Sequence, residues 1–114
     1  MPGDDRLYVG HMLDLATSIR DKTHRLARAD FDADENLRLA LAHLLQTIGE
    51  AARHVSPGFR ETHPEIPWHA IVAMRHRVVH DYMNVDEDVV WKTATAEIPP
   101  LLEQLSRLNP PEQL

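Results

Sequence analysis

The stretch PWHAIVAMRHRVVHDYMN, residues 67–84, decides how this sequence folds and where its chemistry lies. At about 100° per residue its apolar side chains fall on one helical stripe, which comprises Trp68, Ile71, Val72, Val78, Val79 and Tyr82. Proline suits the first position of a helix, so the spacing predicts a helix from Pro67 to near Tyr82 or Met83. Arg75 falls in the middle of this stripe, where a helix should bury apolar groups.

Two further helices are expected before this stretch. The first runs from about Asp5 to Ala29, and its apolar stripe comprises Tyr8, Met12, Leu15, Ile19 and Leu26. The second follows Asp32-x-x-Glu35, in which Asp32 takes the capping position, and it runs to about Val55. A turn at residues 56–58 ends it, and a loop then leads to Pro67.

Gly49 lies inside the second of these helices, within the sequence IGEAAR of residues 48–53. A glycine inside a helix costs about 1 kcal/mol relative to alanine. We therefore expect a close approach at Gly49, by a neighbouring helix or, as the alternative, by a ligand.

A last helical region is expected after residues 84–86, which form a stop and a new N-cap. It begins at Glu87, is broken or kinked by Pro99-Pro100, and resumes in a leucine-rich segment that reaches Leu108. Together these elements predict an all-α, four-to-five-helix up-down bundle. We expect one domain, residues 1–114, with its core in about residues 5–108, and a bundle this small would gain from dimerising.

Composition narrows the class of protein. Hydrophobic residues make up 43% of the 114, and no apolar run approaches the roughly 18 residues that span a membrane. We expect a cytoplasmic protein with no membrane partner, since no secretory signal is visible. The absence of cysteine excludes disulfides and thiolate zinc sites. The net charge of −6 argues against wrapping nucleic acid over a broad surface, but it allows a local phosphate site.

Several kinds of site find little support in the sequence. His76 and His80 are four residues apart and would share a helix face, but a zinc site needs a third protein ligand. We therefore expect no metal site and no cofactor. The four glycines are not clustered, which excludes a glycine-rich phosphate loop. The serines lie in no nucleophile elbow.

The remaining candidate site consists of Arg75, His80 and Tyr82. A buried guanidinium is costly without a partner, so Arg75 either pairs with an acid such as Glu50 or faces a polar cleft. On an ideal helix His80 points about 140° away from Arg75, although the two could converge if the helix loosens, or meet across a dimer axis. Tyr82 lies back near Arg75. The sequence leaves open whether Arg75 is catalytic or forms a structural bridge with Glu50.

These residues resemble a known family. Arg75-x4-His80-x-Tyr82 matches the Arg-x4-His-x-Tyr motif of HepT-like toxins of the HEPN domain superfamily. The resemblance extends to IGEAAR at 48–53, to HPEIPWHAIVAMRHRVVHDY at 63–82 and to VW at 90–91, and it covers roughly residues 5–108. Such toxins often carry asparagine directly after the arginine, where this chain has His76.

The resemblance implies a HEPN-like homodimer that acts as a metal-independent ribonuclease, with the motif helices lining a cleft at the interface. Arg75 and His80 would be catalytic, with His76 and Glu50 as possible assistants. The implied partner is a cognate nucleotidyltransferase antitoxin that silences the toxin by transferring AMP to Tyr82. The alternative is a non-catalytic HEPN subunit that presents a substrate to a nucleotidyltransferase. A third interpretation is a helical bundle in which Arg75 is only a structural ion pair.

Overall fold

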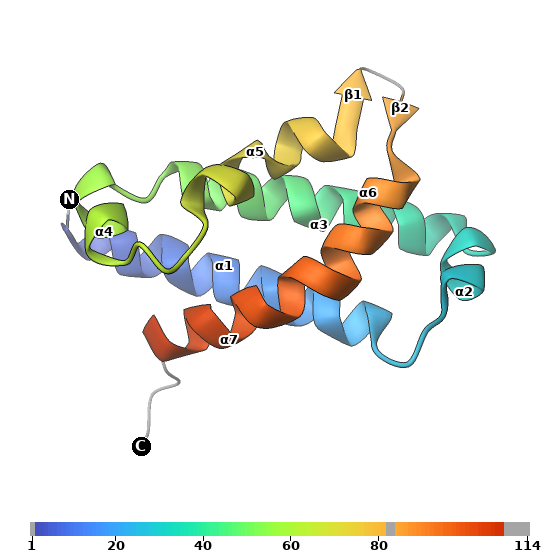
Figure 1. Cartoon of the computed structure of the whole chain (residues 1–114), viewed down its shortest axis with the longest axis horizontal. Helices are drawn as coiled ribbons and strands as arrows, with labels where there is room; N and C mark the ends of the chain where they lie inside the picture. The colour runs from blue at the N-terminus through green and yellow to red at the C-terminus, as the bar shows by residue number, and fades with distance from the viewer. Residues whose placement is uncertain (1, 82–83, 109–114) are drawn as a thin grey trace.

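Helix α3 (Glu35–Arg53) is the central element of the fold, and α1 (Pro2–Thr23) and α5 (Trp68–Val78) both pack against it (Figure 1). The computed structural model describes residues 2–81 and 84–108, with side chains for 4–79 and 84–108. The other elements are the helices α2 (Arg28–Asp32) and α4 (Pro57–Thr62), the strands β1 (Val79–Asp81) and β2 (Asn84–Val85), α6 (Glu87–Lys92), the π-helical segment η1 (Thr93–Glu97), and α7 (Ile98–Leu108). The long helices run in alternating directions, which confirms the predicted all-α bundle.

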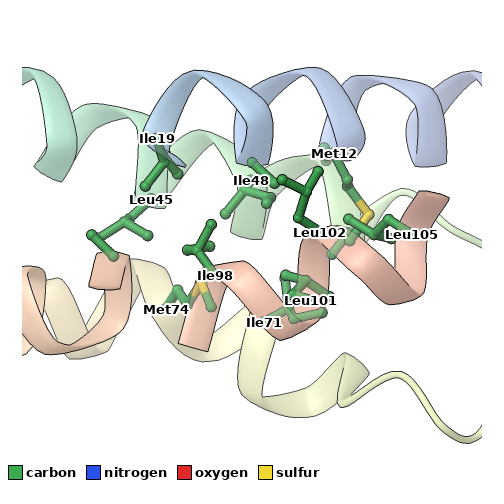
Figure 2. Packing of buried hydrophobic residues seen from close by; sticks show 14 of the residues in the cluster. Met12, Ile19, Leu45, Ile48, Ile71, Met74, Ile98, Leu101, Leu102 and Leu105 are labelled. Carbon is green, nitrogen blue, oxygen red and sulfur yellow. The ribbon is translucent and has the colours of Figure 1, made fainter. Parts of the chain in front are cut away.

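The core lies between α1, α3, α5 and α7, and Figure 2 shows how their apolar side chains interdigitate. Its labelled members are all buried; they are Met12, Ile19, Leu45, Ile48, Ile71, Met74, Ile98, Leu101, Leu102 and Leu105. Burial of these side chains is the main stabilising contribution to the bundle. Among the described residues, no helix combines the length and the apolar character needed to cross a bilayer.

The first helix ends earlier than predicted, at Thr23 rather than at Ala29. The Thr23 hydroxyl donates to the Ile19 carbonyl at 3.0 Å, and Arg25 adopts a left-handed conformation with φ of 68°, which ends the helix. The turn allows the separate helix α2 to bury Phe31 completely, with its ring centroid 5.2 Å from that of Trp91. The apolar pattern of the sequence would continue the first helix to Ala29, but the burial of Phe31 favours an earlier end.

Helix α3 is capped by Asp34, so the predicted capping role of Asp32 was wrong. The Asp34 carboxylate accepts a hydrogen bond from the Leu37 amide at 3.0 Å, which satisfies an otherwise unpaired donor of the first turn. Asp32 instead accepts a hydrogen bond from Arg28 at 2.8 Å. The predicted loop after Ser56 also differs, because Ser56 caps the short helix α4 through the Phe59 amide.

Helix α5 ends at Val78, four residues before the predicted end at Tyr82. Its buried residues are Trp68, Ile71, Met74 and Val78. The chain then forms an antiparallel hairpin in which Val79 pairs with Val85, and the Asp86 amide donates to the Val78 carbonyl at 2.8 Å. The β-branched pair of residues 78 and 79 fits a strand as well as a helix, and the partner strand decides between the two.

The C-terminal helices form one continuous path from α6 to α7 (Figure 1). The Asp86 carboxylate caps α6 through the Val89 amide, as the sequence predicts. Pro99 and Pro100 were expected to break or kink the helix; the regular α-helix that begins at Glu87 ends at Lys92, and both prolines lie in the first turn of α7. The π-helical segment η1 lies directly before them. Proline has no backbone amide donor, and the wider hydrogen-bonding pattern of η1 means that these two donors are not needed.

Candidate active site

Arg75 lies in the last turn of α5, and its side chain is 58% exposed. Arg75 lies outside the buried face on which the helical stripe would place it, and Met74 is the residue that is buried at this level. Its guanidinium nitrogen Nη1 lies 3.5 Å from Oε2 of Glu50 on α3. Arg75 therefore needs no buried partner and can face a ligand from solvent.

Glu50 is shared between three basic groups. Its Oε1 accepts a hydrogen bond from Arg53 at 2.6 Å and lies 3.6 Å from Nε2 of His54. The hydrogen bond from Arg53 lowers the pKa of Glu50, and the charges of Arg53, Arg75 and His54 act in the same direction. Because the Glu50 side chain is 40% exposed, its pairing with Arg75 is a weak, solvent-screened tether.

The close approach that the sequence predicts at Gly49 explains why Glu50 reaches Arg75. A Cβ atom on Gly49 would lie 2.9 Å from the Ile71 carbonyl oxygen and 3.6 Å from the Arg75 amide. The neighbour is therefore the backbone of α5, which confirms the expectation of a neighbouring helix. Glycine allows α3 and α5 to cross at this point, and the next residue of α3 is Glu50.

Arg75 and Glu50 line a shallow depression of about 320 Å³ on the surface between α3 and α5. Its other lining residues lie along α3; they are His43, which is exposed, and Gln46 and Thr47, which are half-buried. A cation at one side of a polar depression is suited to holding an anionic group such as phosphate.

A second depression, of about 420 Å³, adjoins the first and shares Thr47 and Glu50 with it. It runs toward the beginning of α1, where Tyr8 and His11 line it, and it includes His54 at the end of α3. The Tyr8 and His54 rings are stacked, with centroids 4.9 Å apart and an angle of 19° between their planes.

The other predicted site residues follow Arg75 along the chain. His80 belongs to strand β1, so it does not share a helix face with His76 as predicted. The side chain of His80 and the whole of Tyr82 lie outside the described residues. His76 is exposed on α5. In the part of the chain that the structure describes, no group of three histidine or carboxylate side chains could hold a metal ion.

Comparison with known proteins places this chain in a family. The model of a family described as ribonuclease HepT-like matches residues 12–108. The chain belongs to this family. A relative from Thermococcus cleftensis, named "Probable ribonuclease HepT", is 33% identical over 102 residues, which are 90% of this chain and 93% of the relative. A relative from Caldanaerobacter subterraneus, named a "Putative RNase", is 32% identical over 103 residues, which are 90% of this chain and 92% of the relative. No solved structure matches the chain with significance.

Membership of the HepT-like family confirms the resemblance and the predicted enzyme class, a ribonuclease. Sequence reasoning missed the depression around Tyr8, because it assigned Tyr8 to an apolar stripe of the first helix. The signal that could have found it is the helical spacing of Tyr8 and His11, and that of Thr47 and Glu50 on α3 with His54 directly after the helix.

Proposed function

We propose that this HepT-like chain is a toxin-type endoribonuclease that needs no metal ion, with Arg75 and His80 as its catalytic residues. The observation that carries the proposal is the position of Arg75, exposed at the end of α5 and beside a polar depression. Its only described ionic tether is the screened contact with Glu50, and a phosphate can displace it. The strand that contains His80 begins directly after this helix.

The chemistry requires few protein groups because RNA carries its own nucleophile. The 2′-hydroxyl oxygen attacks the adjacent phosphorus, and the bond from phosphorus to the 5′ oxygen breaks. The products are a 2′,3′-cyclic phosphate and a free 5′-hydroxyl. His80 is suited to moving the proton from the attacking to the leaving oxygen, since imidazole titrates near neutral pH. Arg75 would bind the non-bridging oxygens and stabilise the pentavalent phosphate.

Two neighbours would assist the catalytic pair. Glu50 would act as a positioning residue, because it holds the guanidinium of Arg75 at the edge of the depression when no RNA is bound. His76, exposed one residue after Arg75, is a candidate for a second proton carrier.

We propose that the activity of the ribonuclease is regulated through the same motif. The active form would be a homodimer, with the ends of two α5 helices lining a shared cleft. A cognate nucleotidyltransferase antitoxin would join AMP to Tyr82. In that reaction the phenolic oxygen attacks the α-phosphorus of ATP, and pyrophosphate leaves. The added phosphate would place bulk and negative charge near Arg75, which opposes binding of RNA.

The proposal is tested by cleavage of RNA by the purified chain in the presence of EDTA. We expect the wild-type chain to cut under these conditions, and Arg75→Ala and His80→Ala to lower the rate about 100-fold or more. Arg107→Ala is the matched control, because Arg107 is an exposed arginine that pairs with an acid, Glu103, away from the site.

Two results would contradict the proposal. The catalytic assignment fails if both folded variants cut as fast as the wild-type chain. If the wild-type chain leaves RNA intact but binds its transferase, the non-catalytic partner subunit is the correct interpretation.

A further inference from the structure

The depression around Tyr8 and His54 is a separate feature from the phosphate-binding end of the site. Tyr8 packs partly against the core, which fixes the orientation of its ring, while the His54 side chain is 47% exposed. His11 contributes a third ring, edge-on to Tyr8 at a centroid distance of 5.8 Å and an angle of 88°. The rings of Tyr8 and His11 on α1 and of His54, which follows α3, therefore border one hollow.

The exposed lining of this hollow is mostly apolar, and its few charged side chains select the polar groups that it can accept. Asp14 and Glu50 both line it, and these carboxylates repel a phosphate but accept hydrogen bonds from N–H donors. The guanidinium of Arg75 lines only the adjoining depression. The hollow is therefore aromatic with carboxylates at its border, whereas the adjoining depression holds the cation Arg75, and both parts share Thr47 and Glu50.

We propose that the hollow bordered by Tyr8, His11 and His54 is a nucleobase subsite, in which an unpaired base of single-stranded RNA stacks on the Tyr8–His54 pair. The inference rests on the proposed function, which makes RNA the ligand. A base has a flat face for the rings, and amino or imino donors for the carboxylates. Its own phosphate would then extend along the surface toward Arg75. The volume of about 420 Å³ lies within the range of small-ligand sites.

This assignment gives the chain a way to bind RNA without a broad basic surface. Stacking tolerates any base and does not depend on protein charge, which suits a chain with a net charge of −6. It also restricts the substrate to single strands or loops, because a base within a duplex cannot reach a ring that is fixed on a helix.

The test uses a short single-stranded oligonucleotide of 2′-deoxynucleotides, which the enzyme cannot cut because the nucleophile is absent. We expect Tyr8→Leu, which keeps an apolar side chain but loses the ring, and His54→Ala to weaken binding roughly 5- to 100-fold. Tyr8→Phe should bind as the wild-type chain does. His63→Ala is the matched control, because His63 contacts an aromatic ring, that of Phe59 at 4.6 Å, but lines neither depression.

A second measurement separates stacking from a structural effect of the substitutions. The wild-type chain should lose affinity when one nucleotide of the oligonucleotide is made abasic. Tyr8→Leu should show no further loss with that abasic strand, because the same interaction has already been removed. Thermal unfolding of each variant shows whether its affinity refers to a folded chain. His54→Ala is the substitution at the more exposed position.

The outcomes distinguish the subsite from the proposed function. Equal binding by the wild-type, Tyr8→Leu and His54→Ala chains would overturn the subsite, even if cleavage depends on Arg75. A change in oligomeric state with unchanged oligonucleotide binding would also overturn it, and would assign the hollow to contact between copies. Ring-dependent binding without Arg75-dependent cleavage would support the subsite and refute the catalytic proposal.

Discussion

The Nη1 atom of Arg75 lies 3.5 Å from Oε2 of Glu50, and both side chains are open to solvent. This geometry addresses the question that the sequence leaves open, whether Arg75 is a structural ion pair. An exposed pair at this distance is screened by solvent and contributes little to stability. The structure therefore offers no strong stabilising reason for an arginine at this position.

The first prediction concerns the coupling between these two residues. In a double-mutant cycle with Arg75→Gln and Glu50→Gln, we expect the effects of the two substitutions on the free energy of unfolding to be additive, with no resolvable coupling between them. Neutral substitutions are preferable to exchange of the charges, because an arginine at position 50 would face Arg53. Urea denaturation measures the coupling, and RNA cleavage should be lost in both variants that lack Arg75. A coupling of several kcal/mol would favour the structural interpretation instead.

The second prediction concerns the crossing of α3 and α5. Gly49→Ala should destabilise the fold by about 1–3 kcal/mol, because the new Cβ would lie 2.9 Å from the Ile71 carbonyl and force the helices apart. This loss opposes the gain of about 1 kcal/mol that alanine brings within a helix. Gly58→Ala is the control, since a Cβ at position 58 meets nothing within 4 Å. If both variants unfold at the same denaturant concentration, the close approach has no energetic importance.

The third prediction concerns pH. The buried Asp5 carboxylate accepts hydrogen bonds from the Ser56 amide at 2.8 Å and the Ser56 hydroxyl at 2.7 Å, and these lower its pKa below the ordinary value of 3.8. Its pKa is lower in the folded than in the unfolded chain, so the stabilisation is complete well above pH 3.8 and is lost as the pH falls through the folded pKa.

Asp5→Asn should therefore lower the free energy of unfolding by about 1–2 kcal/mol at neutral pH, and by less at acid pH. Denaturant unfolding at a series of pH values measures this difference. Asp4→Asn provides the control, because its carboxyl is exposed beside Asp5. An equal loss of stability at neutral and acid pH would show that the ionised carboxylate is not the stabilising group.

The fourth prediction concerns modification of the motif tyrosine. Coexpression with the cognate nucleotidyltransferase should raise the intact mass of the chain by whole adenylyl units, and Tyr82→Phe should abolish the increase. The chain contains two tyrosines, so Tyr8→Phe is an exact chemical control and should leave the increase unchanged. An adenylyl group found on any other residue would contradict the role of Tyr82.

Much of the helical layout follows from local sequence. The Asp86 cap of α6 is encoded within a few residues, so the sequence predicts it correctly. The close approach at Gly49 is also predicted, because glycine is costly in a helix without a packing reason. The cap of α3 shows the limit of prediction from local sequence. Asp32 and Asp34 are both chemically suited to cap a helix, and the position of the buried Phe31 selects Asp34.

The sequence by itself determined the family, the bundle and the residues of the motif, because these depend on residue type and spacing. Only the tertiary structure decided that α5 ends at Val78, since the hairpin needs the Asp86 amide and the pairing of Val79 with Val85. Only the tertiary structure placed Tyr8 against His54, because the antiparallel packing of α1 on α3 joins residues far apart in the chain. Local spacing specifies the faces of each helix, whereas the rotation and crossing of the packed helices decide which faces form a site.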